Sequence, residues 1–257
     1  MKTSKNLSFM PLMAARKSLL SFLVAVAVLA AASSQAHSNL ILNGSFEDPV
    51  VPVGGYTNFL AGSHAITGWT VVGVDSAVVS STFMQSGITF NAQAGIQWLD
   101  LTGVTSNSPN SGVTQSVATT IGQGYELKFY VGSTTDATSS HFFFPTTVDL
   151  SIDGGTRTHY FNPTGPTNML DWKLFTVDFT AAQSTTNLAF LNGAAANNFE
   201  TALDNVQLSP TAAPEPGSVT LLGLGLASFG GMTWLRKRKA TLFAARVRRA
   251  KVPADVS

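Results

Sequence analysis

The chain has 257 residues, of which 44% are hydrophobic and 11% charged, and its formal net charge at pH 7 is +1. It contains no cysteine, which excludes disulfide bonds, thiolate metal sites and cysteine nucleophiles. The charge is uneven: residues 37–213 hold twelve Asp and Glu but only three Lys and Arg, a formal charge of −9. Because an acidic region repels phosphate backbones, we expect no nucleic-acid binding.

The first 36 residues have the pattern of a secretory signal peptide. A basic stretch precedes the apolar run 19–32. Ser34 and Ala36 place small residues at the −3 and −1 positions of a cleavage site, which predicts removal of residues 1–36 and a mature start at His37. An uncleaved N-terminal anchor is the alternative, and the shortness of the apolar run favours cleavage.

The sequence pattern of the next region, residues 37–209, predicts a single all-β domain. Short β-branched and aromatic runs are separated by turn residues, and no helical periodicity is long enough for crossover connections. Asp153-Gly154-Gly155 is a hairpin signal. The pattern therefore predicts an antiparallel β-sandwich of about ten strands. The predicted segments are 39–46, 68–72, 95–101, 113–117, 125–131, 147–152, 156–161, 173–179, 187–191 and 202–208.

Several motifs in this region resemble those of a known class of jelly-roll modules, the galactose-binding-like and carbohydrate-binding type. The domain is most similar to the domain-of-unknown-function family shared by plant cell-wall proteins and bacterial surface proteins. The resemblance implies a jelly-roll β-sandwich. The motifs are Asn39-Leu40-Ile41-Leu42-Asn43-Gly44-Ser45-Phe46-Glu47, Gly68-Trp69, Gln97-Trp98-Leu99-Asp100-Leu101, the run 112–118 with Gln115, and Ala202-Leu203-Asp204-Asn205-Val206.

The same resemblance implies one structural calcium ion. In related carbohydrate-binding modules, residues at the positions of Glu47 and Asp204 hold calcium together with nearby backbone carbonyls. Carboxylates and carbonyls are the hard oxygen ligands that Ca²⁺ prefers. Asp100 is a weaker third candidate. The alternative is that these are ordinary carboxylates at turns and strand ends.

Aromatic residues supply the candidate ligand-binding surface. Trp69 and Trp98 fit the core better than a sugar-stacking platform, because large aromatics dominate core burial. Phe142, Phe143 and Phe144 are consecutive, and successive side chains of a strand point to opposite faces, so at least one ring should be exposed. We therefore predict a contact patch at these three residues. A loop folded over the end of the sandwich is the alternative.

No motif in the chain indicates catalysis. There is no H-E-x-x-H or G-x-S-x-G sequence. Glycoside hydrolysis needs only two opposed carboxylates, but nothing in the sequence selects a pair among the twelve acids of the domain. We predict that the protein is not an enzyme.

The C-terminal region combines a polar motif, an apolar segment and a basic cluster. After a linker that begins at residue 210, Pro214-Glu215-Pro216 precedes the 19 uncharged residues 217–235. A helix of that length spans about 28 Å, enough for a bilayer core. The cluster Arg236, Lys237, Arg238 and Lys239 would stop it on the cytoplasmic side, with residues 236–257 as a basic tail on anionic lipid.

These three features together resemble a PEP-CTERM sorting signal of Gram-negative bacteria. In that family the signal is read by an exosortase, a membrane enzyme, and the proteins are associated with exopolysaccharide and biofilm matrix. One departure is that such proteins usually end just after the basic cluster, whereas this chain continues for 18 residues. The resemblance implies a membrane-anchored precursor that is passed to the cell surface or extracellular matrix.

We therefore predict a non-catalytic exported surface protein that binds polysaccharide weakly. The expected partners are the exosortase, the membrane and a polysaccharide. A polysaccharide-modifying enzyme or its accessory module is one alternative. A protein-binding regulator at the envelope is another.

Overall fold

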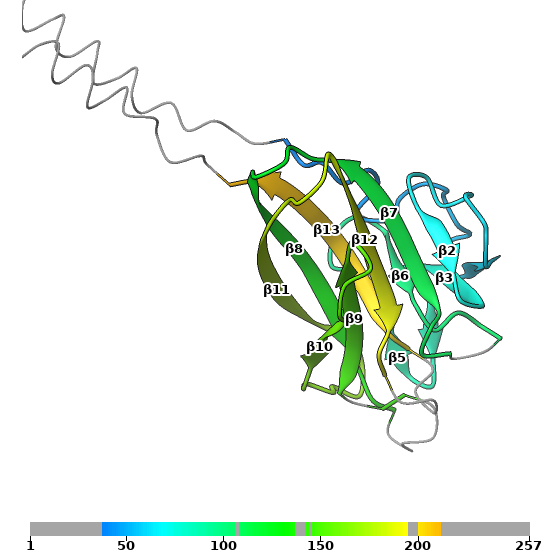
Figure 1. The fold of residues 1–257 in the computed structure, drawn as a ribbon. Coiled ribbons are helices and arrows are strands. Elements are labelled where there is room, and N and C mark those ends of the chain that lie inside the picture. Colours follow the sequence, from blue (N-terminus) through cyan, green and yellow to red (C-terminus); the bar gives the residue numbers. More distant parts are fainter. Residues whose placement is uncertain (1–37, 106–107, 137–141, 144, 195–199, 212–257) are drawn as a thin grey trace, which may run out of the picture. The chain divides into compact units, whose positions relative to one another are not determined.

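A computed structural model describes residues 38–105, 108–136, 142–143, 145–194 and 200–211. These residues form two facing antiparallel sheets, a six-stranded and a five-stranded one, with a small hairpin beside them (Figure 1). The predicted all-β jelly-roll sandwich is confirmed. Over the described residues no helix is long and apolar enough to cross a membrane. The predicted signal peptide and C-terminal helix lie outside them.

The strands occur in the sheets in an order that differs from their order in the chain, as a jelly roll requires. The six-stranded sheet runs β1 (Tyr56–Leu60), β3 (Asp75–Ser80), β6 (Gln97–Asp100), β13 (Ala202–Pro210), β8 (Gly124–Ser133) and β11 (Asp171–Thr180). The five-stranded sheet runs β10 (Thr158–Asn162), β9 (Thr146–Ile152), β12 (Thr185–Asn192), β7 (Gly112–Ala118) and β2 (Thr70–Val72). The separate hairpin pairs β4 (Met84–Gln85) with β5 (Ile88–Thr89).

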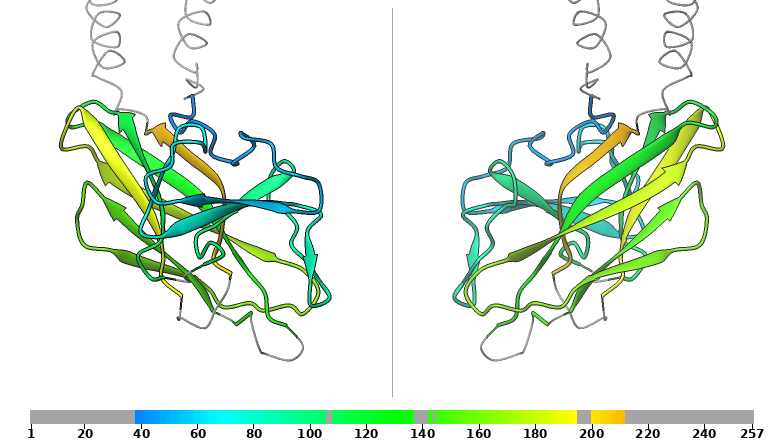
Figure 2. Two further views of the ribbon diagram at one scale, coloured as in Figure 1. Left: turned by 90° about the vertical axis from the view of Figure 1, so that its right-hand side faces the viewer. Right: turned by 90° about the vertical axis from the view of Figure 1, so that its left-hand side faces the viewer.

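The main core lies between the two sheets, whose arrangement is seen from two sides in Figure 2. Trp69 lies 5.4 Å from Phe46 and 6.1 Å from Phe190, ring centroid to ring centroid. Phe129 packs edge-on against Phe190 at 5.2 Å. All four rings are at most 1% exposed. Rings from both sheets and from the opening segment therefore meet in one cluster.

The opening segment, residues 39–46, forms turns rather than the strand that we predicted. Gln115 of β7 binds both main-chain groups of Leu42, accepting from its N–H at 2.9 Å and donating to its carbonyl at 3.0 Å. Asn43 and Phe46 have positive φ angles of 53° and 57°, which a strand does not allow. The Gln115 side chain thus makes the hydrogen bonds to Leu42 that a neighbouring strand would make in a sheet.

The opening segment also crosses the last strand at close range. The Val206 N–H of β13 donates to the Gly44 carbonyl at 2.9 Å. A Cβ at residue 44 would lie 2.0 Å from the Val206 oxygen. Glycine is therefore required here because the two backbones touch.

We expect Gly44→Ala to lower the free energy of unfolding by about 1–3 kcal/mol, because the added methyl group forces the two backbones apart. Denaturant unfolding of the purified protein measures this. Gly55→Ala is the matched control, since a Cβ there would meet its nearest atom at 3.4 Å. Equal unfolding midpoints for the two variants would contradict the expectation.

Candidate functional site

The six-stranded sheet carries a second apolar cluster on the face turned away from the main core. In β3 and β6, Val78 and Leu99 point into the main core, so their neighbours Val79 and Trp98 point to the other face. Residues of the β4–β5 hairpin cover this face. The buried members of this outer cluster are Ala77, Val79, Ile88, Phe90, Trp98, Phe142, Leu170 and Ala202.

One row of paired residues crosses this outer face and contains a single acid. The row runs Ala77, Asp100, Ala202, Gly132 and Trp172, on five neighbouring strands. A Cβ at Gly132 would lie 2.9 Å from the Trp172 ring, so the missing side chain is what lets that ring lie over the sheet. Asp100 is 8% exposed in this otherwise apolar row. A buried acid among alanine and tryptophan needs an explanation other than packing.

A cleft of about 230 Å³ opens over this acid. Its walls include five aromatic residues and two acids, together with Gly103 and Val104. The rim is accessible, since Tyr56 is 44% exposed. The aromatic members are Tyr56, Phe83, Phe90, Trp98 and Phe142, and the acids are Asp100 and Glu200.

The aromatic wall is continuous because each ring touches the next. Tyr56 meets Phe83 edge-on at 5.6 Å, and Phe83 lies 5.6 Å from Phe90. Phe90 stacks on Trp98 at 6.1 Å and meets Phe142 at 5.1 Å. The Trp98 indole N–H donates to the Phe90 carbonyl at 2.8 Å, which fixes the ring. The wall is thus rigid at its base and exposed at Tyr56.

Asp100 is held by one of its two oxygens. Its Oδ1 accepts from the Thr102 N–H at 2.9 Å, the Thr102 hydroxyl at 2.6 Å and the Thr201 N–H at 3.2 Å. Within the described residues no protein donor reaches Oδ2. Burial raises the pKa of Asp100 to about 7, against the effect of these donors and with a small contribution from the charge of Asp75.

Glu200 lies on the same cleft, two residues before the start of β13. Its Oε1 accepts from the Ala202 N–H at 3.2 Å, and its Oε2 from the Thr146 hydroxyl at 3.4 Å. Burial raises the pKa of Glu200 well above its ordinary value, and the charge of Asp100 raises it further. Asp100 is therefore close enough to Glu200 to disfavour the ionised form of Glu200.

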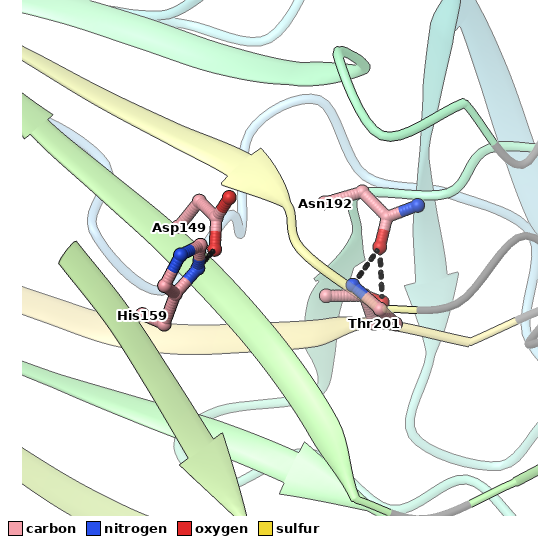
Figure 3. Close-up of polar contacts among 5 residues, drawn as sticks. Asp149, His159, Asn192 and Thr201 are labelled. Atoms are coloured by element: carbon pink, nitrogen blue, oxygen red, sulfur yellow. Dashed lines mark hydrogen bonds and ion pairs between the residues drawn. The ribbon is translucent and has the colours of Figure 1, made fainter. Parts of the chain in front are cut away.

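Figure 3 shows the contact between Asn192 and Thr201, the residue that follows Glu200 in the chain. Asn192, at the end of β12, accepts a hydrogen bond from the Thr201 hydroxyl at 2.8 Å, and Thr201 in turn donates from its N–H to Asp100. The figure also shows the second polar pair, in which His159 Nδ1 lies 2.5 Å from Asp149 Oδ1. That pair belongs to strands β9 and β10 of the five-stranded sheet and not to the cleft.

Asp75 positions the loop that forms one side of the cleft. Its Oδ2 accepts from the N–H groups of Val104 and Thr105, both at 2.9 Å, and from Asn58 Nδ2 at 3.0 Å. Burial alone would raise the pKa of Asp75, but these donors outweigh it and the pKa is lowered. Asp75 is therefore a charged structural group. Asp100, in contrast, lines the cleft.

The predicted calcium ligands Glu47 and Asp204 do approach the same segment, but through hydrogen bonds. Glu47 Oε1 accepts from the N–H groups of Ile96 and Gln97 at 2.9 and 3.0 Å. Asp204 Oδ2 accepts from the N–H groups of Gln93 and Ala94 at 2.8 and 2.9 Å.

The groups that donate to Glu47 and Asp204 are main-chain N–H groups. They stabilise a carboxylate, but they cannot themselves coordinate a cation. In the part of the chain that the structure describes, no group of three or more His, Asp or Glu side chains could hold a metal. The calcium ion, for which two carboxylates and nearby main-chain carbonyls were predicted as ligands, stays a prediction. The alternative reading, carboxylates that fix turns, accounts for the contacts of both residues.

Two residues of the predicted aromatic patch, Phe142 and Phe143, are buried to different extents. Phe142 is 4% exposed and belongs to the cleft wall, where its carbonyl accepts from the Thr135 hydroxyl at 3.0 Å. Phe143 is half-buried, and Phe144 lies outside the described residues. The predicted role of these residues in ligand binding stays a prediction.

Sequence reasoning missed the rest of the site. Asp100 was considered only as a calcium ligand, and Glu200, Tyr56, Phe83 and Phe90 were not selected. One signal was present in the sequence. Asp100 follows Trp98 by two residues in an alternating run, so the two side chains point to the same face of the strand, and an acid on a buried face is unusual.

The fold and this cleft define an all-β jelly-roll domain with a concave aromatic and acidic site. The chain belongs to the DUF642 family, described as "Protein of unknown function", which matches residues 39–209. Among curated proteins, none matches the chain.

Solved structures with a similar fold include three carbohydrate-binding modules. A CBM4 structure is 18% identical with a TM-score of 0.33, and covers 66% of this chain and 99% of its own. The CBM22-1 xylan-binding domain of Paenibacillus barcinonensis Xyn10C is 16% identical with a TM-score of 0.36, covering 64% and 99%. A family 16 carbohydrate-binding module is 20% identical with a TM-score of 0.38, covering 66% and 99%. At these values the similarities carry no argument about the ligand of this chain.

Proposed function

We propose that the domain binds polysaccharide through the cleft on the outer face of the six-stranded sheet. The observation that carries this proposal is the composition of the cleft, which combines a continuous aromatic wall with two carboxyl groups. Flat rings pack against the C–H faces of a sugar, and carboxyl oxygens accept hydrogen bonds from its hydroxyl groups. A volume of about 230 Å³ is below the roughly 300–1,000 Å³ of pockets that enclose drug-sized ligands, so it suits one sugar residue of a longer chain.

This binding would serve a non-catalytic surface protein of a Gram-negative bacterium. The export signal and the Pro214-Glu215-Pro216 motif support sorting by an exosortase and delivery to the exopolysaccharide layer. The apolar segment 217–235 supports a membrane-anchored precursor. The acidic charge of the domain supports a partner other than nucleic acid.

A second candidate function is hydrolysis of a glycosidic bond, and the pair Asp100 and Glu200 favours it. In many glycosidases one carboxyl group with a raised pKa is the general acid, and a second, ionised carboxylate is the base or nucleophile. Burial raises the pKa of Glu200 well above its ordinary value and that of Asp100 to about 7. Release of reducing ends from a polysaccharide, lost in Glu200→Gln, would support this function. Binding without release would support the first.

We expect Tyr56→Ala to weaken polysaccharide binding about five- to tenfold, because the exposed end of the aromatic wall is worth about 1 kcal/mol. Isothermal titration of the full chain in detergent, with soluble oligosaccharides, measures this. The matched control is Phe161→Ala, which removes a ring of similar exposure from β10, in the other sheet. Equal losses in the two variants would place binding elsewhere.

A further inference from the structure

The described chain begins and finishes at the same end of the sandwich (Figure 1). The Leu40 N–H donates to the Leu208 carbonyl at 2.8 Å, which ties the opening residues to the end of β13. The Gln123 side chain donates to the Thr211 carbonyl at 2.7 Å, which ties the β7–β8 turn to the last described residue. The same turn donates a main-chain hydrogen bond to the Ala181 carbonyl, in the β11–β12 turn, at 2.9 Å. This terminal end of the domain consists of residues 38–42, 119–123, 181–184 and 208–211.

The terminal end is uncharged, although the domain as a whole is acidic. None of its four segments contains Asp, Glu, Lys, Arg or His, whereas residues 37–213 hold twelve acids. Its exposed side chains are small or polar, apart from Ile121, which is 67% exposed, and Leu42, which is 57% exposed. Ile121 lies in the β7–β8 turn, two residues before the glutamine that holds Thr211. An anionic surface therefore repels the terminal end less than it repels the acid-bearing parts of the domain.

The chain that follows the terminal end is short. Only the five residues 212–216 separate Thr211 from the uncharged apolar segment 217–235. An extended chain advances at most about 3.5 Å per residue, so the terminal end stays within about 20 Å of the start of that segment. The cleft lies farther away, because Asp100 pairs with Ala202 at the opposite end of β13, and the nine residues of this strand extend over about 25 Å.

We propose that the terminal end rests on a lipid bilayer, with Ile121 inserted among the headgroups. This inference rests on the proposed function, because it requires the membrane-anchored precursor. Insertion would remove the apolar surface of Ile121 from water, and neighbouring hydroxyl and amide side chains would donate to phosphate and ester oxygens of the lipids. Anionic lipids would repel the acidic remainder of the domain. The contact would therefore turn the cleft away from the bilayer, toward a polysaccharide outside the cell.

The absence of cysteine from the chain makes this contact measurable at single positions. Ile121→Cys gives the full chain one thiol for an environment-sensitive fluorophore at the terminal end. Met84→Cys is the matched control, since Met84 is 64% exposed and lies in the β4–β5 hairpin beside the cleft. The labelled chains are reconstituted in vesicles of phosphatidylethanolamine and phosphatidylglycerol in a ratio of about 7 to 3, with and without a nitroxide-bearing lipid that quenches fluorophores in contact with the bilayer.

We expect the nitroxide lipid to quench the label at residue 121 about fivefold more strongly than the label at residue 84. The emission of the label at residue 121 should also shift to shorter wavelength, because the headgroup region is less polar than water. Equal quenching at the two positions would overturn the proposal.

A label in the adjacent turn, introduced by Ala182→Cys, tests the assignment to Ile121. We expect the further change Ile121→Asp to reduce quenching of this label to the level at residue 84, because anionic lipids repel a carboxylate. Ile121→Val keeps an apolar side chain and should retain the quenching. Since residue 121 is exposed, both variants should fold, and their denaturant unfolding midpoints check this. Unchanged quenching in Ile121→Asp would show that the short linker alone holds this end near the lipid, and would overturn the insertion of Ile121.

Vesicle flotation separates this inference from the function on which it rests. A full chain that does not float with the vesicles would overturn both the anchored precursor and the lipid contact. Flotation with equal quenching at residues 121 and 84 would overturn the lipid contact alone and leave the anchor in place. A shift of the emission at residue 121 without quenching by the nitroxide lipid would also overturn the contact, since it would place this residue against protein.

Discussion

Trp98→Ala is expected to lower the free energy of unfolding by about 3–5 kcal/mol. Trp98 is 2% exposed and forms the floor of the outer cluster, where it touches Phe90 at 6.1 Å and Trp172 at 6.3 Å. Its loss removes the largest side chain of that cluster and leaves the Phe90 carbonyl without its indole donor. Since a typical domain has only about 5–15 kcal/mol of stability, the variant should be close to unfolded at 37 °C.

Trp98→Phe separates the two contributions. It retains most of the apolar volume but loses the hydrogen bond to the Phe90 carbonyl, so we expect a loss of about 1–3 kcal/mol. Denaturant unfolding of the parent and the two variants measures both values. If Trp98→Ala cost less than 1 kcal/mol, the outer face of the sheet would not be a second core, and the cleft would have no rigid floor.

The two faces of β6 show how far the sequence could predict this arrangement. The alternation at residues 95–101 predicts a strand, and the strand is present. Alternation usually indicates one buried face, yet all four residues of β6 are buried. The cover on the second face comes from residues 83–90, Phe142 and Leu170, which are distant in sequence, so a local pattern cannot reveal it.

Two strands of the same sheet were not predicted, for a related reason. All six residues of β3 are buried, so its sequence shows no alternation between apolar and polar positions. β1 is a short edge strand whose sequence contains Thr57 and Asn58 between two aromatic residues. A strand covered on both faces and a short edge strand both lack the period of two on which such predictions depend.

The motifs that suggested the family were informative about the fold and less so about the site. Gln115 binds the main chain of Leu42, and Gln97 Nε2 donates to the carbonyls of Phe46 and Pro49. Glu47 accepts from the segment that starts β6. These residues attach the start of the domain to its sheets. Which partner each side chain takes depends on long-range contacts that appear only when the strands are assembled.

The stability of the domain is expected to fall as the pH rises from about 4 to about 8. Burial raises the pKa of Asp100 from 3.8 to about 7, and it raises the pKa of Asp204 to about 7 as well, although three main-chain donors oppose the second shift. In the unfolded chain these groups ionise near pH 4. Between pH 4 and 7 the folded state therefore binds more protons than the unfolded state, and the free energy of unfolding decreases with pH.

Below about pH 4 both states are protonated and this contribution is fully present, and above about pH 7 it is lost. For one group the shift corresponds to on the order of 4 kcal/mol. The pKa of Glu200, which lines the same cleft, shifts in the same direction. The lowered pKa of Asp75 acts in the opposite direction, but only at pH values below its ordinary value of 3.8, outside this window.

The variant Asp100→Asn measures how much of this pH dependence of the stability comes from Asp100. We expect denaturant unfolding midpoints of the parent to decline from pH 4.5 to pH 8, and those of the variant to decline less, so that at pH 8 the variant is the more stable protein. Asp178→Asn should retain the slope of the parent. A parent whose stability rises with pH over this range would show that Asp100 and Glu200 are compensated in the folded state by a positive group. The pKa of Asp100 would then not be raised in the folded state.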